Sequence, residues 1–394
     1  MTTNGETPGP PEKASVPYQA VPVPVRDSAA PARAAGAGRI TEIYAVGLLA
    51  RMLEIPSPSY NETALGRELV RSMRELGFTA YVDGTGNAVG EITRGAGPTV
   101  MLLGHMDTIP ETMPTRSADG KLYGRGAVDA KGPLAAMICA AAAAVDFRGK
   151  IVVIGAVEEE TPGSRGAMAI RRTYPVPNAL IIGEPSGWSN VVLGYKGKLD
   201  LRLRVDCPST HPSNPAPKAT ERVAAAWAAL LELLGPQASH ASFDQPAATL
   251  VSFTGDIVSA EMDVSVRTPV GFDVPGLLAA LDEAWAGGEV TVLNTVAACR
   301  TGRADPVVRA LSAGIRAQEG RPTAKLKTAT SDMNTLAEVW DLPMGTYGPG
   351  DSTLDHSDDE HILITDYIRG IAVLTAALTE LGGLDPAALQ GKLR

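Results

Sequence analysis

The stretch VVIGAVEEETPGSRG, residues 152–166, joins two patterns that seldom follow one another. Its first six residues are small or apolar, as in a strand that is buried on both faces of a sheet. Three carboxylates, Glu158, Glu159 and Glu160, come next. Charged triplets are usually solvated loop residues. The rest of the chain therefore has to indicate whether these three carboxylates do anything more.

The composition is that of an ordinary globular protein, with 394 residues, 44% hydrophobic and 20% charged. A net charge of −9 argues against binding to nucleic acid or to an anionic membrane. No apolar run is long enough to span a bilayer, and the first forty residues lack the apolar core of a signal peptide. The three cysteines form no C-x-x-C pair, which is typical of a reduced compartment. We therefore expect a cytoplasmic protein.

The periodicity of the chain divides it into a tail and two domains. Residues 1–38 are rich in Pro and Ala and are expected to be disordered. Residues 39–194 and 304–394 alternate between apolar strand-like runs and helical patterns, which predicts a mostly parallel sheet covered by helices. Residues 195–303 follow the order β-α-β-β-α-β, the ferredoxin-like unit. We expect this unit to be inserted into the α/β domain.

Carboxylates and histidines fall where several predicted strands end. In open α/β sheets, ligands gather at the carboxyl ends of strands. Taken singly, each residue has another explanation, since an isolated His is often structural and an Asp before a helix is usually an N-cap. Burying several carboxylates together without cations is costly, whereas bound metal ions offset that cost. The residues concerned are His105, Asp107, Asp129, Glu159, Glu160, Glu184 and His356.

The motifs GHMDT, GRGAVDAKG, EEE, GEPSG and GPGDSTLDH, in this order, resemble those of a dinuclear zinc peptidase family. That family contains aminoacylase, carboxypeptidase G, acetylornithine deacetylase and succinyl-diaminopimelate desuccinylase. The resemblance runs from about residue 41 to residue 383. It implies an α/β catalytic domain, with the inserted ferredoxin-like unit acting as a lid and dimerisation domain, and therefore a homodimer.

The resemblance also implies a set of metal ligands. Asp129 would bridge two Zn²⁺ ions, for which Co²⁺ is a substitute. His105 and Glu184 would complete one site, and Glu160 and His356 the other.

Two further residues are assigned to catalysis by the same resemblance. Glu159 would be the general base, and Asp107 would fix the second nitrogen of the His105 ring. Because the TPGSR spacer varies in length among relatives, an assignment shifted by one residue within the glutamate triplet stays open.

Four residues are implied to contact the substrate. His211, in CPSTHPSNP, matches a histidine that reaches the scissile carbonyl, often across a dimer interface, although Pro212 replaces the usual serine. Arg267 matches an arginine for the substrate's α-carboxylate, and Ser331 and Asn334 lie near the pocket. The alternatives are a histidine in a surface loop and an arginine in a surface ion pair. Many deacetylase relatives carry an arginine where Asn334 stands.

Longer strings such as GRGAVDAKGPLAAM and IIGEPSGWSNVVLGYKGKL resemble one branch of the family. This branch releases lysine or ornithine, in amino-acid biosynthesis, from the C-terminal glutamate of a small amino-group carrier protein. We therefore hypothesise a metal-dependent amidohydrolase of a linear amide or isopeptide bond. The alternatives are a deacetylase of N-acetylornithine or another N-acyl amino acid, and a non-hydrolytic metal-binding or amide-transferring relative in a secondary-metabolite pathway.

An acidic carrier would require local positive charge on this acidic chain. The predicted strand around residues 196–204 supplies four candidates, although charges that alternate for solubility explain them equally well. These are Lys196, Lys198, Arg202 and Arg204.

Overall fold

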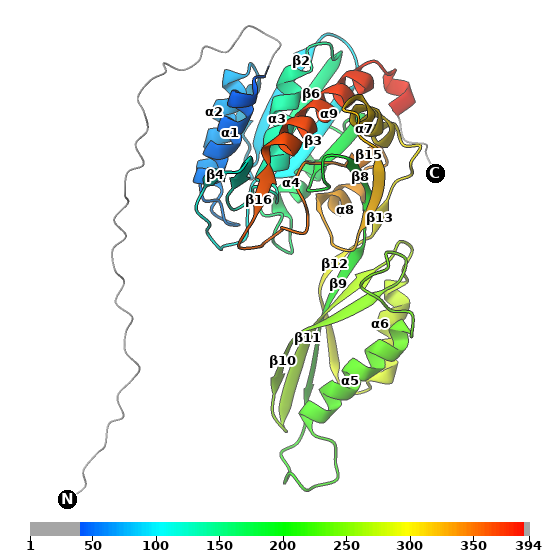
Figure 1. Cartoon of the computed structure of the whole chain (residues 1–394). Coiled ribbons are helices and arrows are strands. Elements are labelled where there is room, and N and C mark those ends of the chain that lie inside the picture. The colour runs from blue at the N-terminus through cyan, green and yellow to red at the C-terminus, as the bar shows by residue number, and fades with distance from the viewer. Residues whose placement is uncertain (1–39, 390–394) are drawn as a thin grey trace, which may run out of the picture. The chain divides into compact units, whose positions relative to one another are not determined.

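Two β-sheets of different character organise the chain in the computed structural model, which describes residues 40–389 (Figure 1). The predicted tail at residues 1–38 lies outside the described residues. The larger sheet has nine strands and the second has four. A short third sheet consists of β4 (Arg116–Ala118), β5 (Lys121–Tyr123) and β16 (His361–Leu363).

The nine-stranded sheet is mixed, and its central strands β6, β3, β7 and β15 are parallel. The antiparallel pair β1–β2 extends it at one edge, and β8 pairs with both β13 and β14 at the other. In sheet order the strands are β1 (Thr79–Val82), β2 (Ala88–Arg94), β6 (Gly149–Ala156), β3 (Thr99–His105), β7 (Ala179–Gly183), β15 (Met344–Thr346), β8 (Asn190–Tyr195) and β13 (Cys299–Arg300), with β14 (Thr323–Lys327) beside β8.

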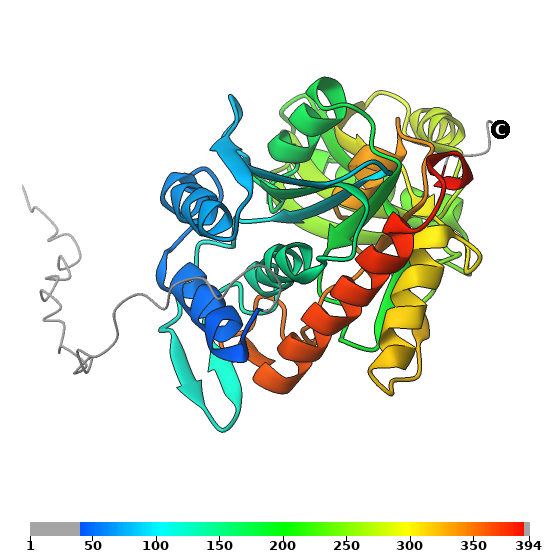
Figure 2. The ribbon, with the colours of Figure 1, turned by 90° about the horizontal axis from the view of Figure 1, so that it is seen from above.

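Helices cover both faces of this sheet, which explains why its central strands are apolar throughout. In β3, Val100 and Leu102 pack into one hydrophobic cluster, whereas Met101 and Leu103 pack into the other. Figure 2 shows α9 between α3 and α7 on the first face. That face carries α1 (Glu42–Glu54), α2 (Thr63–Glu75), α3 (Lys131–Ala143), α7 (Pro306–Ala317) and α9 (Ile364–Gly382), and the other carries α4 (Arg165–Thr173) and α8 (Asp332–Ala337).

The four-stranded sheet has the predicted β-α-β-β-α-β order. All its pairs are antiparallel, in the order β10-β11-β9-β12. Inward residues of β9 such as Leu199 and Leu201 pack against the two helices, while the outward residues are polar. The elements are β9 (Gly197–Asp206), α5 (Ala219–Leu234), β10 (Ala247–Gly255), β11 (Ser259–Thr268), α6 (Val274–Ala284) and β12 (Glu289–Val296).

The chain passes from the large sheet into the small one at Lys196 and returns at Ala297–Ala298. The domain limits expected at residues 195 and 303 stay a prediction, because the described part of the chain forms one compact unit. A 3₁₀-helix, Pro386–Leu389, ends the described chain. No helix within residues 40–389 is both long and apolar enough to cross a membrane.

Candidate metal centre

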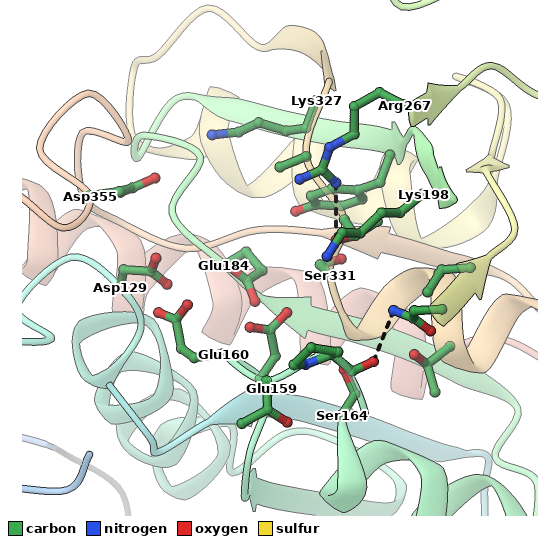
Figure 3. Close-up of a pocket in the computed structure, with 18 of the residues that line it drawn as sticks. Asp129, Glu159, Glu160, Ser164, Glu184, Lys198, Arg267, Lys327, Ser331 and Asp355 are labelled. Atoms are coloured by element: carbon green, nitrogen blue, oxygen red, sulfur yellow. Dashed lines mark hydrogen bonds between the residues drawn. The ribbon is translucent and has the colours of Figure 1, made fainter. Parts of the chain in front are cut away.

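The predicted ligands lie together at one edge of the nine-stranded sheet. His105 is the last residue of β3, Glu159 and Glu160 follow β6, and Glu184 follows β7. Because β6, β3 and β7 are parallel neighbours, their carboxyl ends meet. Figure 3 shows the carboxylates of Asp129, Glu159, Glu160 and Glu184 turned toward one another.

Asp129 lies between the two histidines. Its Oδ1 is 3.1 Å from Nε2 of His105, and its Oδ2 is 3.3 Å from Nε2 of His356. Glu184 Oε1 approaches the same His105 nitrogen at 3.7 Å, while Glu160 Oε1 lies 2.9 Å from His356 Nε2. The Asp129 carboxylate therefore belongs to two groups of possible ligand atoms, one around His105 and one around His356.

The His105 ring is oriented by backbone. Its Nδ1 lies 3.0 Å from the carbonyl oxygen of Asp107, which can only accept a hydrogen bond, so Nδ1 carries the proton. The Asp107 carboxylate is farther away, with Oδ1 at 3.4 Å. Nε2 therefore faces Asp129 and is the ring nitrogen available to a cation.

The Asp107 carboxylate chiefly holds the glutamate turn. Its Oδ1 accepts the N–H of Glu159 at 3.0 Å, and its Oδ2 accepts the N–H of Glu160 at 3.0 Å. The hydroxyl of Ser59 also donates to Oδ2, at 2.8 Å. From the sequence we predicted only a contact between Asp107 and the His105 imidazole. Its bonds to backbone N–H groups could not be predicted, because a sequence motif records side chains and not backbone partners.

The three glutamates of the opening stretch have different surroundings. Glu158 is buried and accepts a hydrogen bond from Nε of Arg165 at 2.7 Å, so it supports the turn. Glu159 and Glu160 instead line a cavity of about 400 Å³. Glu159 comes close enough to His105 and Glu184 to share a metal ion with them, so distance alone does not separate a ligand from a base.

The charges of the cluster fit a pair of dications. Burial and the neighbouring Glu184 raise the pKa of Glu159 well above its ordinary value, and burial likewise raises the pKa of Glu184. Hydrogen bonds with Asp129 and Glu160 raise the pKa of His356 to about 10. Carboxylate oxygens and imidazole nitrogens are ligands that Zn²⁺ prefers. Cations at this point would relieve the repulsion among the buried carboxylates.

The wall opposite the carboxylates is basic. Lys198, Arg267 and Lys327 line the same cavity (Figure 3). Nη1 of Arg267 donates a long hydrogen bond, 3.4 Å, to Thr330 Oγ1, and burial lowers the pKa of Arg267 and of Lys327. Among residues 40–389, no carboxylate lies within 4.0 Å of either of these two side chains, whereas Lys198 pairs with Asp200 at 2.8 Å.

The other residues predicted to contact the substrate lie in different surroundings. Ser331 lines the cavity and caps α8. Asn334 does not line it: Nδ2 donates to the carbonyls of Lys196 and Ala297, and Oδ1 accepts the N–H of Ser331. These three bonds use both N–H groups of its amide and one lone pair of Oδ1, and a substrate contact by Asn334 stays a prediction. His211 is exposed in the loop before α5, away from the cavity lining, and contacts Ser213.

The strand expected to attract an acidic carrier is already neutralised. Lys196 is buried and donates to the carbonyls of Ser239 and Gln245. The other three basic side chains form ion pairs with carboxylates on the same sheet: Lys198 with Asp200, Arg202 with Asp263 and Arg204 with Asp206. Alternation of charge for solubility therefore explains this strand better.

A buried carboxylate beside Asp129 was missed by the sequence analysis. Glu360 is completely buried and accepts the N–H of Asp129 at 3.1 Å. It follows a run of exposed acidic residues, from which no pattern distinguishes it.

Comparison with known proteins agrees with this architecture. A relative from Deinococcus radiodurans, named LysW-lysine hydrolase, is 40% identical over 352 residues, covering 85% of this chain and 96% of the relative. A tripeptidase from Staphylococcus aureus has the same fold, with a TM-score of 0.76 at 17% identity over 88% of this chain and 100% of the other. The aminopeptidase PepT from Bacillus cereus gives 0.75 at 17% identity, over 87% of this chain and 99% of the other.

The family model described as peptidase family M20/M25/M40 matches residues 101–380. This span contains the whole cluster of carboxylates and histidines at the edge of the large sheet. The chain therefore belongs to peptidase family M20/M25/M40.

Proposed function

We propose that the chain hydrolyses an amide bond and releases lysine, or ornithine, from an amino-group carrier protein of the LysW type. The observation that supports this most is the 40% identity, over 352 residues, to the relative named LysW-lysine hydrolase. The cavity suits this reaction, because the acidic side chains that could hold metal ions face basic side chains that could bind an anionic group of the substrate.

The proposal includes two metal ions, Zn²⁺ or Co²⁺. Asp129 would contact both, with His105 and Glu184 on one side and Glu160 and His356 on the other. When bound, such ions act as Lewis acids and lower the pKa of water to about 7.

In this proposal Glu159 moves the proton. Its backbone N–H is held by Asp107, so the carboxylate is aimed into the cavity from a fixed turn. Glu159 would take a proton from the attacking water and return it to the leaving nitrogen, for which it has to lie within about 3 Å of both. Burial and the neighbouring Glu184 raise the pKa of Glu159 when no cation is bound. Bound cations would lower this pKa again, so that Glu159 could accept a proton.

Recognition of the released amino acid is proposed for Arg267. A lysine that is joined to the carrier through its α-amino group keeps its own α-carboxylate. Arg267 and Lys327 line the cavity without a carboxylate partner among the described residues, so an anionic group of the substrate would complete them.

The deciding experiment compares two substrates with the same metal-loaded protein. Release of lysine from a lysine-loaded LysW carrier should proceed with a higher kcat/KM than release from N-acetyl-lysine. The Glu159→Gln variant, purified in parallel, controls for contaminating hydrolases. A preference for N-acetyl-lysine would exclude the carrier and favour the deacetylase, while leaving amide hydrolysis intact.

We also propose a homodimer in which His211 serves the partner's site. Two features support this: His211 is exposed and outside its own cavity, and the edge strand β10 exposes Leu250, Val251 and Phe253. Unpaired apolar edges of this kind tend to associate.

Complementation tests the dimer. Glu159→Gln and His211→Ala chains should each be nearly inactive alone, and mixing should restore activity, because one mixed site has both residues intact. Mixtures that stay inactive although mixed dimers form would refute a His211 that acts across the interface.

A further inference from the structure

Glu360 makes an unusual set of contacts for a residue outside the cavity. Its side chain is fully buried. Oε1 accepts the N–H groups of Val128, at 2.9 Å, and Asp129, at 3.1 Å. Oε2 accepts the N–H of Gly126 at 3.1 Å and Nη1 of Arg125 at 2.8 Å. Two donors at each oxygen use the capacity of the carboxylate fully.

These contacts join two loops that are more than 200 residues apart in the sequence. One loop, residues 124–130, carries Asp129. The other, residues 348–360, carries His356 and ends at Glu360. Neither loop lies in a strand or helix of its own, and the backbone hydrogen bond between them, from the N–H of Gly124 to the carbonyl of Glu360, is long, at 3.3 Å.

The conformation of the first loop depends on outside support. Gly126 has a φ of +88°, and a Cβ atom there would lie 2.9 Å from the Lys131 side chain, so only glycine fits. Lys131 is itself buried and donates to the carbonyls of Met52 and Ile55. On the opposite side, Glu360 accepts hydrogen bonds from three backbone N–H groups of this turn, which has no strand partner, and a fourth from the Arg125 guanidinium.

We propose that Glu360 is a positioning residue that joins the two loops, so that Asp129 and His356 face each other across 3.3 Å before any metal binds. Glu360 does not line the cavity and so is not a ligand or a catalytic residue. It acts on metal affinity through Asp129, as partners behind metal ligands commonly do. This inference rests on the metal site of the proposed function.

The test measures metal binding directly. In Glu360→Gln, one acceptor oxygen becomes an NH₂ donor that faces two N–H groups, so the loop is released. Titration calorimetry with Zn²⁺ or Co²⁺ should give an affinity about 10–100-fold weaker than in the wild-type chain. The visible spectrum of the Co²⁺-loaded variant should also change, because it reports coordination geometry.

A matched control separates positioning from general stability. Glu68 on α2 also accepts several hydrogen bonds, from Arg51, Arg71 and Ser72, but contacts no candidate ligand. Glu68→Gln should leave metal affinity and the Co²⁺ spectrum unchanged.

A second variant covers the case in which Glu360→Gln does not fold. Glu360→Asp keeps the charge beside Arg125 but is one methylene too short to reach Asp129, so its metal affinity should also fall. A folded variant at position 360 that binds two ions with wild-type affinity would overturn the inference. A wild-type chain that binds no metal would instead overturn the proposed function.

Discussion

The two sides of the cavity are built differently. On the large sheet, His105, Glu160 and Glu184 follow parallel strand ends, and the turns that carry candidate ligands are held by buried groups such as Asp107 and Glu360. On the small sheet, Arg267 projects from within a strand, and the hydrogen bond of its guanidinium to Thr330 is 3.4 Å long. The candidate ligands are thus preorganised by the fold, whereas in the proposed function Arg267 would be completed by the substrate.

The largest expected effect concerns the preorganised side. Glu159→Gln should lower kcat by about 10²–10⁴-fold, because it removes a proton acceptor without changing the shape of the turn. Metal content, measured by elemental analysis, should stay at two ions per chain. Loss of an ion would show that Glu159 is a ligand and that the triplet assignment is shifted by one residue.

A pair of core substitutions tests whether the two sides are independent. Leu281→Ala, in the core of the small sheet and its helices, should lower the free energy of unfolding by about 2–5 kcal/mol and leave metal affinity unchanged. Leu134→Ala, in α3 beneath the strand ends, should cost a similar amount and also weaken metal binding. Denaturant unfolding and metal titration provide both readouts. Equal effects on metal binding would mean that the two regions are not separable.

Substrate binding should respond at the other wall. Arg267→Ala should lower kcat/KM, mostly by raising KM. The loss should correspond to the free energy of a hydrogen bond to a charged group, about 1.5–3 kcal/mol. Arg202→Ala is the matched control, since Arg202 lies in the neighbouring strand β9 but pairs with Asp263 outside the cavity. If the two variants have equal kinetics, Arg267 does not bind substrate.

The smallest expected effect is on the stability of an isolated chain. His211→Ala removes an exposed side chain that contacts only Ser213, so the free energy of unfolding should change by less than about 0.5 kcal/mol. A larger loss, measured at protein concentrations where the chain is monomeric, would indicate a structural role within its own chain.

The same contrast explains what the sequence could predict. Apolar runs followed by His105, Glu160 and Glu184 predict ligands at one sheet edge, because parallel strands bring their ends together. Period-two alternation along β9 and β11 predicts the ferredoxin-like unit for a similarly local reason. Both signals lie within single elements.

What the sequence could not predict depends on contacts between distant segments. The carboxylates of Asp107 and Glu360 bind backbone N–H groups, and any residue supplies such groups, so no motif records the pairing. The short strands β4, β5 and β16 carry too few residues to show a period. Glu62, which precedes α2, likewise has a distant partner, because its carboxylate accepts the N–H of Glu158 at 3.1 Å.

The amide of Asn334 has a mechanical consequence. Its single NH₂ group donates to the carbonyls of Lys196 and Ala297, at 3.0 Å and 2.8 Å, where the chain enters and leaves the small sheet. Both connections are therefore tied to one atom, Nδ2. Moving either connection away from α8 would break a hydrogen bond to that atom. We therefore expect any widening of the cavity mouth to keep these two connections in place and to turn the small sheet about them.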